Sequence, residues 1–222
     1  GFHGRRYGNP WGDWLAIGSE TPLELIDAAY FAYTARLMAE MAEATGRRQE
    51  AATYKDWFQK IQQAFLADFA GSGGRLKVDN QTAYALALYS GVLPDDRRAA
   101  AANRLADLIR ENTFRMNTGF LGTRPLLPVL TATGNHNLAV RLFQSREFPS
   151  WGYEVDNGAN TVWERWNSYT REKGFHEPAM NSFSHYAFGA VSEWMFDSLA
   201  GIDTDAVGFR KLLIRPLPPS PG

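Results

Sequence analysis

The chain has 222 residues, of which 45% are hydrophobic and 21% charged, and its formal net charge is -1. This length allows one large domain or two small ones with a well-buried core. The balanced charge gives no electrostatic drive toward nucleic acid or an anionic membrane. No apolar run approaches the roughly 20 residues that span a bilayer. The absence of cysteine excludes disulfides, thiolate metal sites and a cysteine nucleophile.

Apolar residues recur at helical spacing through most of the chain. The predicted helices run over about 22–44, 48–70, 80–89, 95–112, 125–133, 137–144 and 181–199. Turns marked by glycine separate them, as at Thr45-Gly46 and Thr133-Gly134. We expect successive helices to pair as hairpins.

Two helix starts carry recognisable cap signals. Thr21-Pro22-Leu23-Glu24 has the spacing of a capping box with proline at the first helical position. Asp79 precedes the third helix and is expected to cap it, and Gly91 is expected to end it.

The pattern therefore predicts a mainly α fold. Successive hairpins are typical of a bundle, an α-solenoid or a closed α/α toroid, and the absence of a fixed repeat period weighs against the solenoid. Seven helices would make only part of a toroid. The segment 209–216 has the pattern of a strand, and no partner strand is evident elsewhere in the sequence. Because a single strand is not stable alone, we expect the chain to be a piece of a longer polypeptide.

Aromatic residues are concentrated between Phe143 and Phe196. In the middle of this stretch Glu164 stands between Trp163 and Trp166. Sugar rings present C–H faces that stack on indoles, and their hydroxyl groups bind carboxylates and amides. The segment predicts a carbohydrate site in which the glutamate is an acid–base group.

The same residues also allow purely structural roles. A tryptophan-rich loop can seal a helical core, and Glu164 can form an ion pair with Arg165. His185, expected on the last helix, can be a satisfied helical histidine, and Asp13 can be a turn residue. Neither metal-ligand spacing among the histidines, nor a phosphate-binding glycine loop, nor a Gly-x-Ser-x-Gly motif is present, and no cofactor is expected.

Six segments in order resemble the bacterial α-L-rhamnosidases of glycoside hydrolase family 78. They are 12–15 (GDWL), 81–88 (QTAYALAL), 118–123 (TGFLGT), 148–153 (FPSWGY), 161–166 (TVWERW) and 180–194 (MNSFSHYAFGAVSEW). The resemblance covers almost the whole chain. It implies the second half of an (α/α)6 toroid over residues 1–206 and the start of a C-terminal β domain over 207–222.

The resemblance also implies an activity, the hydrolysis of terminal α-L-rhamnosides with inversion. Glu164 matches the general base of the family, Asp13 and Trp14 match a polar and stacking pair at the sugar, and His185 matches a rhamnose contact. We also expect substrate contacts from Trp151, Trp163 and Trp166.

The general acid of the family lies in an upstream Asp-Glu-Arg segment that this sequence lacks, so the acid is expected from outside the chain. The carboxyl groups within the chain that lie near the predicted site are not favoured for this role; they are Asp13, Glu154, Asp156, Glu172 and Glu177.

The expected partners are a rhamnose-containing glycoside and the upstream half of the same catalytic domain, or a second copy bound through exposed helix faces. Two alternatives stay open. One is a non-catalytic glycan-binding helical fragment, and the other is a different six-hairpin glycosidase, such as an unsaturated glucuronyl hydrolase. The uronate of that substrate requires a cation, and the 163–166 segment offers only Arg165. The compartment, cytoplasmic or secreted, is left open.

Overall fold

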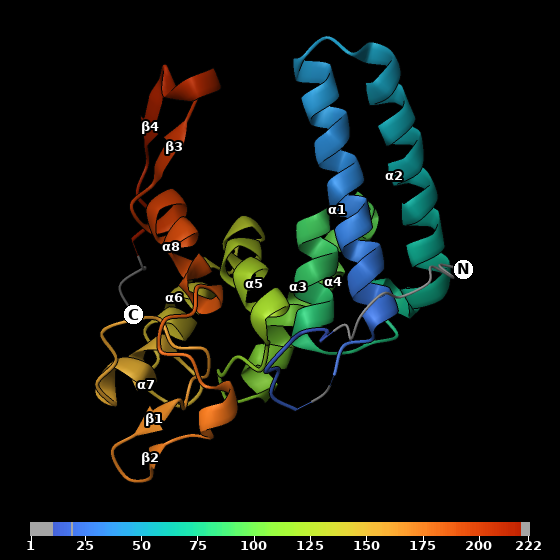
Figure 1. Cartoon of the computed structure of the whole chain (residues 1–222). Coiled ribbons are helices and arrows are strands. Elements are labelled where there is room, and N and C mark those ends of the chain that lie inside the picture. Colours follow the sequence, from blue (N-terminus) through green and yellow to red (C-terminus); the bar gives the residue numbers. More distant parts are fainter. Residues whose placement is uncertain (1–10, 19, 219–222) are drawn as a thin grey trace.

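The computed structural model describes residues 11–18 and 20–218 and is mainly helical (Figure 1). The α-helices in these residues are α1 (Leu23–Ala44), α2 (Arg48–Phe69), α3 (Gln81–Ser90), α4 (Asp95–Glu111), α5 (Phe120–Ala132), α6 (His136–Phe143), α7 (Trp151–Asp156) and α8 (Val191–Trp194). Two short antiparallel pairs accompany them, β1 (Tyr169–Thr170) with β2 (Gly174–Phe175) and β3 (Ile202–Thr204) with β4 (Leu212–Ile214).

Helices α1 and α2 form a long hairpin that extends from the rest of the molecule (Figure 1). Each has 22 residues, and the turn between them contains Gly46 at φ 74°. Small residues such as Ala28, Ala32 and Ala35 are buried along α1. They belong to the same core cluster as Phe65 of α2, and their size allows the helices to pack closely.

Helix α3 lies at the centre of the fold. It packs against α1, α4 and α5, and all of its residues except Tyr89 are buried. A helix that is apolar on nearly every side is a core helix rather than an amphipathic surface helix. Gly91 ends it in the left-handed conformation at φ 75°, as the sequence predicts.

The caps of α1 and α3 differ from the prediction. Thr21 does not form a capping box: Pro22 is the N-cap residue of α1, no side chain caps the helix, and the Thr21 hydroxyl donates to the Asn80 side-chain oxygen at 3.1 Å. That oxygen also accepts from the backbone N–H of Ala83 at 2.9 Å, so Asn80 caps α3 and Asp79 does not. Asp79 instead forms an ion pair with Arg104 at 2.7 Å. The starts of two helices are thereby joined by one hydrogen-bond network.

The last helix is shorter than the predicted 181–199. Helical turns, including a 3₁₀ start and a π-helical end, cover only Ala187–Leu199. The backbone just before them pairs with the loop at 162–164, where the Ser182 carbonyl accepts and the His185 N–H donates, both at 2.9 Å. These groups serve the loop and are not available to a helix, so His185 precedes the helix and does not lie on it.

The C-terminal strand does have a partner, and the prediction of an unpaired strand is wrong. β4 pairs with β3 in antiparallel register, with Ile202 opposite Ile214. The two runs are separated by a turn that contains Gly208 at φ 68°. This hairpin crosses the predicted domain boundary at 206/207, and the start of a β domain there stays a prediction.

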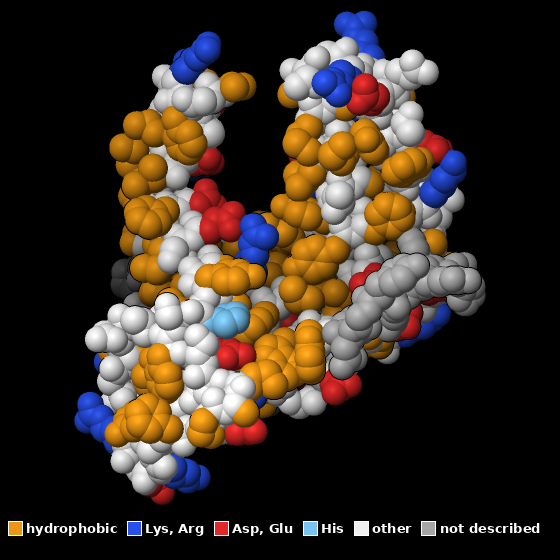
Figure 2. Space-filling model, viewed as in Figure 1, with side chains coloured by type: hydrophobic (Ala, Val, Ile, Leu, Met, Phe, Trp, Pro, Cys, Tyr) orange, Lys and Arg blue, Asp and Glu red, His pale blue; other side chains and the backbone are white. Residues whose placement is uncertain are grey.

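The α1–α2 hairpin and the β3–β4 hairpin stand on either side of an open notch, and Figure 2 shows hydrophobic side chains along its walls. We call the α1–α2 hairpin the helical arm. Its residues Phe31 and Trp57 are 42% and 45% exposed. They border a shallow apolar pocket of about 310 Å³ together with Ile61. None of the described helices is long and apolar enough to cross a membrane.

Candidate active site

Asp13 joins the N-terminal segment to the start of α5. Its carboxylate is buried and accepts four hydrogen bonds, from the Thr82 hydroxyl at 2.5 Å and from the backbone N–H groups of Gly119, Leu121 and Gly122 at 2.8–2.9 Å. A negative charge is stabilised at a helix N-terminus. A carboxylate has about four acceptor positions, so these donors occupy all of them.

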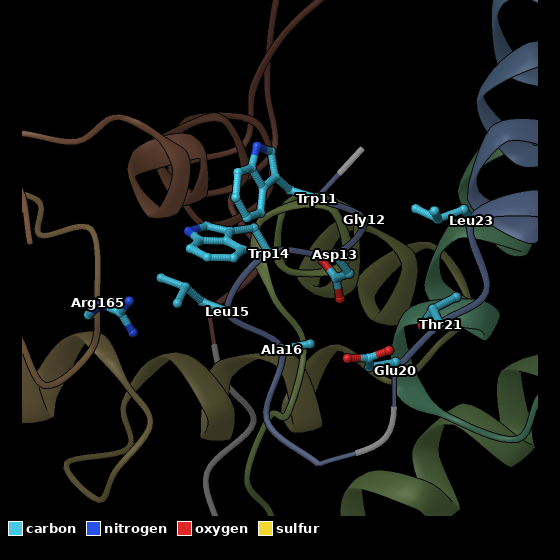
Figure 3. Close-up of a pocket in the computed structure, with 10 residues that line it drawn as sticks. All are labelled: Trp11, Gly12, Asp13, Trp14, Leu15, Ala16, Glu20, Thr21, Leu23 and Arg165. Atoms are coloured by element: carbon cyan, nitrogen blue, oxygen red, sulfur yellow. The ribbon is translucent and has the colours of Figure 1, made fainter. Parts of the chain in front are cut away.

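The residues next to Asp13 form one wall of a pocket of about 540 Å³ (Figure 3). Trp11 and Trp14 meet edge to face, with ring centroids 4.8 Å apart. Trp11 is exposed and Trp14 is half-buried. The Trp14 carbonyl accepts from the N–H of Phe120 at 2.9 Å, which fixes the position of this wall against α5. The pocket therefore has an indole surface on a rigid support.

Arg165 forms part of the opposite wall. In Figure 3 its guanidinium group points toward the side on which Trp14 and Leu15 lie. Segments 11–14 and 163–166 therefore lie at the same end of the helices. Asp13 and Arg165 line this pocket together, whereas Glu164 is not among its lining residues.

Two buried tryptophans hold the loop that carries Glu164. Trp166 stacks on Phe188 at a centroid distance of 3.8 Å, and Trp163 meets Phe183 edge to face at 5.4 Å. Both indoles are at most 4% exposed. Because they anchor the loop on both sides, the residues between them have a defined position.

Glu164 is held by the segment 181–186. Its side-chain Oε2 accepts from the Ser182 N–H at 2.9 Å, and its own N–H donates to the Ser182 carbonyl at the same distance. No hydrogen bond joins Oε1 to the described residues, and the side chain is largely buried. One oxygen is thus used for positioning and the other is available to a water molecule or a substrate.

His185 lies close to Phe120 at the start of α5. Its ring is 4.8 Å from that of Phe120 and stacks on Tyr186. Nδ1 accepts from the N–H of Ala187 at 3.3 Å, so in the neutral ring the proton lies on Nε2. Since Phe120 contacts both His185 and the backbone of Trp14, the start of α5 brings these two predicted site residues together.

Trp151 is half-buried in α7. Its indole N–H donates to the Phe188 carbonyl at 3.0 Å, and its ring packs against Trp166 at 5.2 Å. The geometry therefore gives Trp151 and Trp166 packing contacts behind the loop. Their contact with substrate stays a prediction.

The remaining carboxyl groups considered for the acid lie away from the pocket wall. Asp156, Glu172 and Glu177 are exposed. Glu154 is 3% exposed, and burial raises the pKa of its carboxyl to about 8. Its Oε1 has no hydrogen-bond partner in the described part of the chain. Among the residues at 11–18 and 20–218, no group of side chains has the arrangement of a metal site.

Sequence reasoning did not assign a role to Thr82, Gly119 or Phe120, although all three lie in the segments that carry the resemblance. Gly119 has a specific reason to lack a side chain, since a Cβ there would lie 2.3 Å from the Trp14 carbonyl oxygen. The periodicity of α5 could not show this, because the contact joins residues about a hundred positions apart.

A family model described as the bacterial alpha-L-rhamnosidase 6 hairpin glycosidase domain matches residues 3–199. The chain belongs to this family. An α-L-rhamnosidase of Streptomyces avermitilis is 49% identical over 208 residues, which are 94% of this chain and 20% of that protein. The mainly α, six-hairpin class expected for this member of the family is confirmed.

Two solved structures of family enzymes match the fold. The Streptomyces avermitilis α-L-rhamnosidase complexed with L-rhamnose has a TM-score of 0.89 and 48% identity, covering 96% of this chain and 20% of that one. The native enzyme from Aspergillus terreus has a TM-score of 0.89 and 29% identity, covering 94% of this chain and 25% of that one. The chain thus spans about a fifth to a quarter of the length of these relatives.

Proposed function

We propose that the chain forms part of the catalytic domain of an enzyme that hydrolyses terminal α-L-rhamnosides. The main support is the position of Glu164, a largely buried carboxylate with one oxygen fixed by the Ser182 N–H and the other without a partner among the described residues. The family and the names of its relatives support the proposed substrate class.

In the proposed reaction Glu164 is the general base. Its Oε1 accepts a proton from a water molecule, which attacks the anomeric carbon from the face opposite the leaving group and inverts the configuration. The Ser182 N–H keeps the carboxylate oriented while the proton moves. In such enzymes a second carboxyl, roughly 6.5–9.5 Å from the first, protonates the leaving oxygen. We assign that general acid to residues outside this chain.

The indole of Trp14 is proposed to stack on the rhamnose ring, and His185 to donate from Nε2 to a sugar hydroxyl. Asp13 takes an indirect part, because its acceptor positions are filled by the start of α5. It positions Trp14 beside the pocket. Trp163 and Trp166 are the two least exposed of the residues expected at the sugar. Trp163 therefore supports the loop of Glu164 from the protein interior.

A partner for the exposed helical arm is also part of the proposal. The apolar surface around Phe31 and Trp57 is suited to pack against further helices of the same toroid. Without those helices the same surface would bind a second copy of the chain.

Glu164→Gln tests the assignment. The amide keeps the size of the side chain and cannot take a proton, so turnover of p-nitrophenyl α-L-rhamnoside by the product of the complete reading frame should fall by roughly 10²–10⁴. Azide needs no deprotonation and should restore turnover, giving the inverted glycosyl azide. Glu50→Gln, on the exposed first turn of α2, is the matched control and should keep wild-type turnover.

Wild-type turnover by Glu164→Gln would overturn the role of Glu164. If the wild-type product released p-nitrophenol from no α-L-rhamnoside but processed an unsaturated glucuronide, the alternative hydrolase would be correct. Binding of rhamnose without turnover of either substrate would support the non-catalytic alternative.

A further inference from the structure

Arg165 lies in the pocket wall beside the proposed base and has no role in the reaction described above. Its Nε donates to the Met180 carbonyl at 2.9 Å, and its backbone N–H donates to the Ser168 hydroxyl at 3.1 Å. These two bonds fix both the base of the side chain and the plane of the guanidinium group. Arg165 is therefore a pre-oriented group and not a freely moving surface cation.

The charge of Arg165 is not neutralised by the described part of the protein. None of the ion pairs among residues 11–18 and 20–218 includes it. The side chain is half-buried, and a partly desolvated cation is costly unless an anion or several acceptors compensate it. This arrangement favours a ligand that brings a negative charge into the pocket.

The free edge of the guanidinium group indicates which anion fits. Since Nε is occupied by Met180, Nη1 and Nη2 remain, and the two form a planar pair of donors. A carboxylate accepts from such a pair through both of its oxygens. The geometry of the remaining donors is thus that of a bidentate carboxylate site.

The other charges of the pocket place the anion on the Arg165 side. The Asp13 carboxylate is buried, and the donors of Thr82 and α5 fill its acceptor positions. Glu20 lines the opposite part of the wall, and Figure 3 shows its side chain across the pocket from Arg165. An anionic ligand would be repelled from Glu20 and attracted to Arg165, with the indoles of Trp11 and Trp14 between them.

Rhamnose has hydroxyl groups and a methyl group but no anionic group, so it offers Arg165 hydrogen-bond acceptors and no counter-charge. We infer that Arg165 recognises the carboxylate of the sugar joined to rhamnose, and that the preferred substrates are α-L-rhamnosides of uronic acids. This inference rests on the proposed function and adds the chemical class of the neighbouring residue.

The test compares rhamnosyl-glucuronic acids in 1→2, 1→3 and 1→4 linkage with their methyl esters, which have the same shape without the charge. The enzyme is the product of the complete reading frame, as wild type and as Arg165→Gln, Arg165→Lys and Arg171→Gln. Arg171 is an exposed arginine in the turn between β1 and β2 and does not line the pocket. The measured quantity is the ratio of kcat/KM for each acid to that for its ester.

For the wild type, the acid should be preferred by about 10- to 100-fold in at least one linkage, the usual value of a charge-assisted hydrogen bond. Arg165→Gln should reduce this ratio to near one, Arg165→Lys should keep part of it, and Arg171→Gln should not change it. Turnover of p-nitrophenyl α-L-rhamnoside should be unchanged in Arg171→Gln. In the Arg165 variants a general loss of activity would lower kcat/KM for acid and ester alike and leave their ratio unchanged, so only a fall in the ratio reports the loss of carboxylate recognition.

The inference would be overturned by a wild-type enzyme that cleaves the nitrophenyl rhamnoside and does not prefer the acid in any linkage. It would equally be overturned if Arg165→Gln kept the preference. If the wild type cleaved neither the nitrophenyl rhamnoside nor any disaccharide, the proposed function itself would be wrong and this inference with it.

Discussion

Glu154 is a carboxyl group whose position makes stability depend on pH. It is 3% exposed, its Oε1 lacks a hydrogen-bond partner in the described structure, and burial raises its pKa from 4.5 to about 8. Its backbone carbonyl accepts from the Ala159 N–H at 3.0 Å, where α7 turns into the loop that carries Glu164. The backbone of Glu154 is thus joined to the start of the segment that leads to the proposed base.

The raised pKa determines the direction of the effect. Below about pH 4.5 the carboxyl is protonated in both the folded and the unfolded chain, so it contributes no pH dependence. Between about 4.5 and 8 the unfolded chain releases the proton and the folded chain retains it, so the free energy of unfolding falls as the pH rises. Above about 8 the loss is complete. The difference of the two pKa values sets an upper limit of about 5 kcal/mol, at about 1.4 kcal/mol per unit.

The assay is urea unfolding at pH 5, 6.5 and 8.5 for the wild type, Glu154→Gln and Glu154→Met. Other groups titrate in the same range, so the informative quantity is the difference in slope between variants. Glu154→Gln and Glu154→Met should remove a loss of several kcal/mol between pH 5 and 8.5, and the methionine variant should be the most stable at pH 8.5 because it buries no unpaired polar atom. Glu172→Gln, an exposed change, should follow the wild type.

If the wild type and Glu154→Gln lost the same free energy of unfolding between pH 5 and 8.5, Glu154 would have an ordinary pKa. The carboxyl would then be solvated or paired in the folded chain, and the reasoning from its burial would be refuted.

Three further predictions concern the site and the helical arm. Gly119→Ala should destabilise the fold by several kcal/mol or prevent folding, because the new Cβ would meet the Trp14 carbonyl oxygen; urea unfolding measures this, and an unchanged midpoint would contradict the packing described. Trp14→Ala should weaken rhamnose binding in a titration, and His185→Ala should weaken it by about 0.5–1.5 kcal/mol. If added rhamnose shifts no spectroscopic signal of Trp14 or His185, the two residues have a packing role and do not contact the sugar. The isolated 222-residue chain should self-associate in a sedimentation experiment, and Trp57→Glu should reduce this association. It should also hydrolyse the nitrophenyl rhamnoside at least about 10²-fold more slowly than the product of the complete reading frame. Full activity in a monomer would contradict this prediction.

Local sequence determined most of the helices. The spacing of apolar residues is a property of consecutive positions, and a glycine such as Gly91 ends a helix through its own backbone freedom. For this reason α1, α2, α3 and α4 lie close to where the pattern predicts them. The hairpin order follows from the short turns between the helices.

Tertiary structure decided the partners of the polar and aromatic residues. Thr21 has the sequence of a capping residue, but the Asn80 oxygen, 59 residues away, is the acceptor that it reaches. Likewise the start of the last helix depends on the pairing of Ser182 with Glu164 across the chain. A hydrogen bond to a distant segment engages a side-chain or backbone group that a local cap would otherwise use, and the local pattern does not contain the information to choose between them.

The tryptophans of the site show the same limit. Trp14 and Trp166 both stand in segments that indicate a sugar site, yet Trp14 faces a pocket and Trp166 stacks on Phe188 in the core. An indole gains free energy from burial against either a sugar or a protein ring, so its sequence context predicts that it will be covered and not by what. Only the folded arrangement of α5, α7 and the 163–166 loop determines that Trp166 packs beneath the site and that Trp14 faces the pocket.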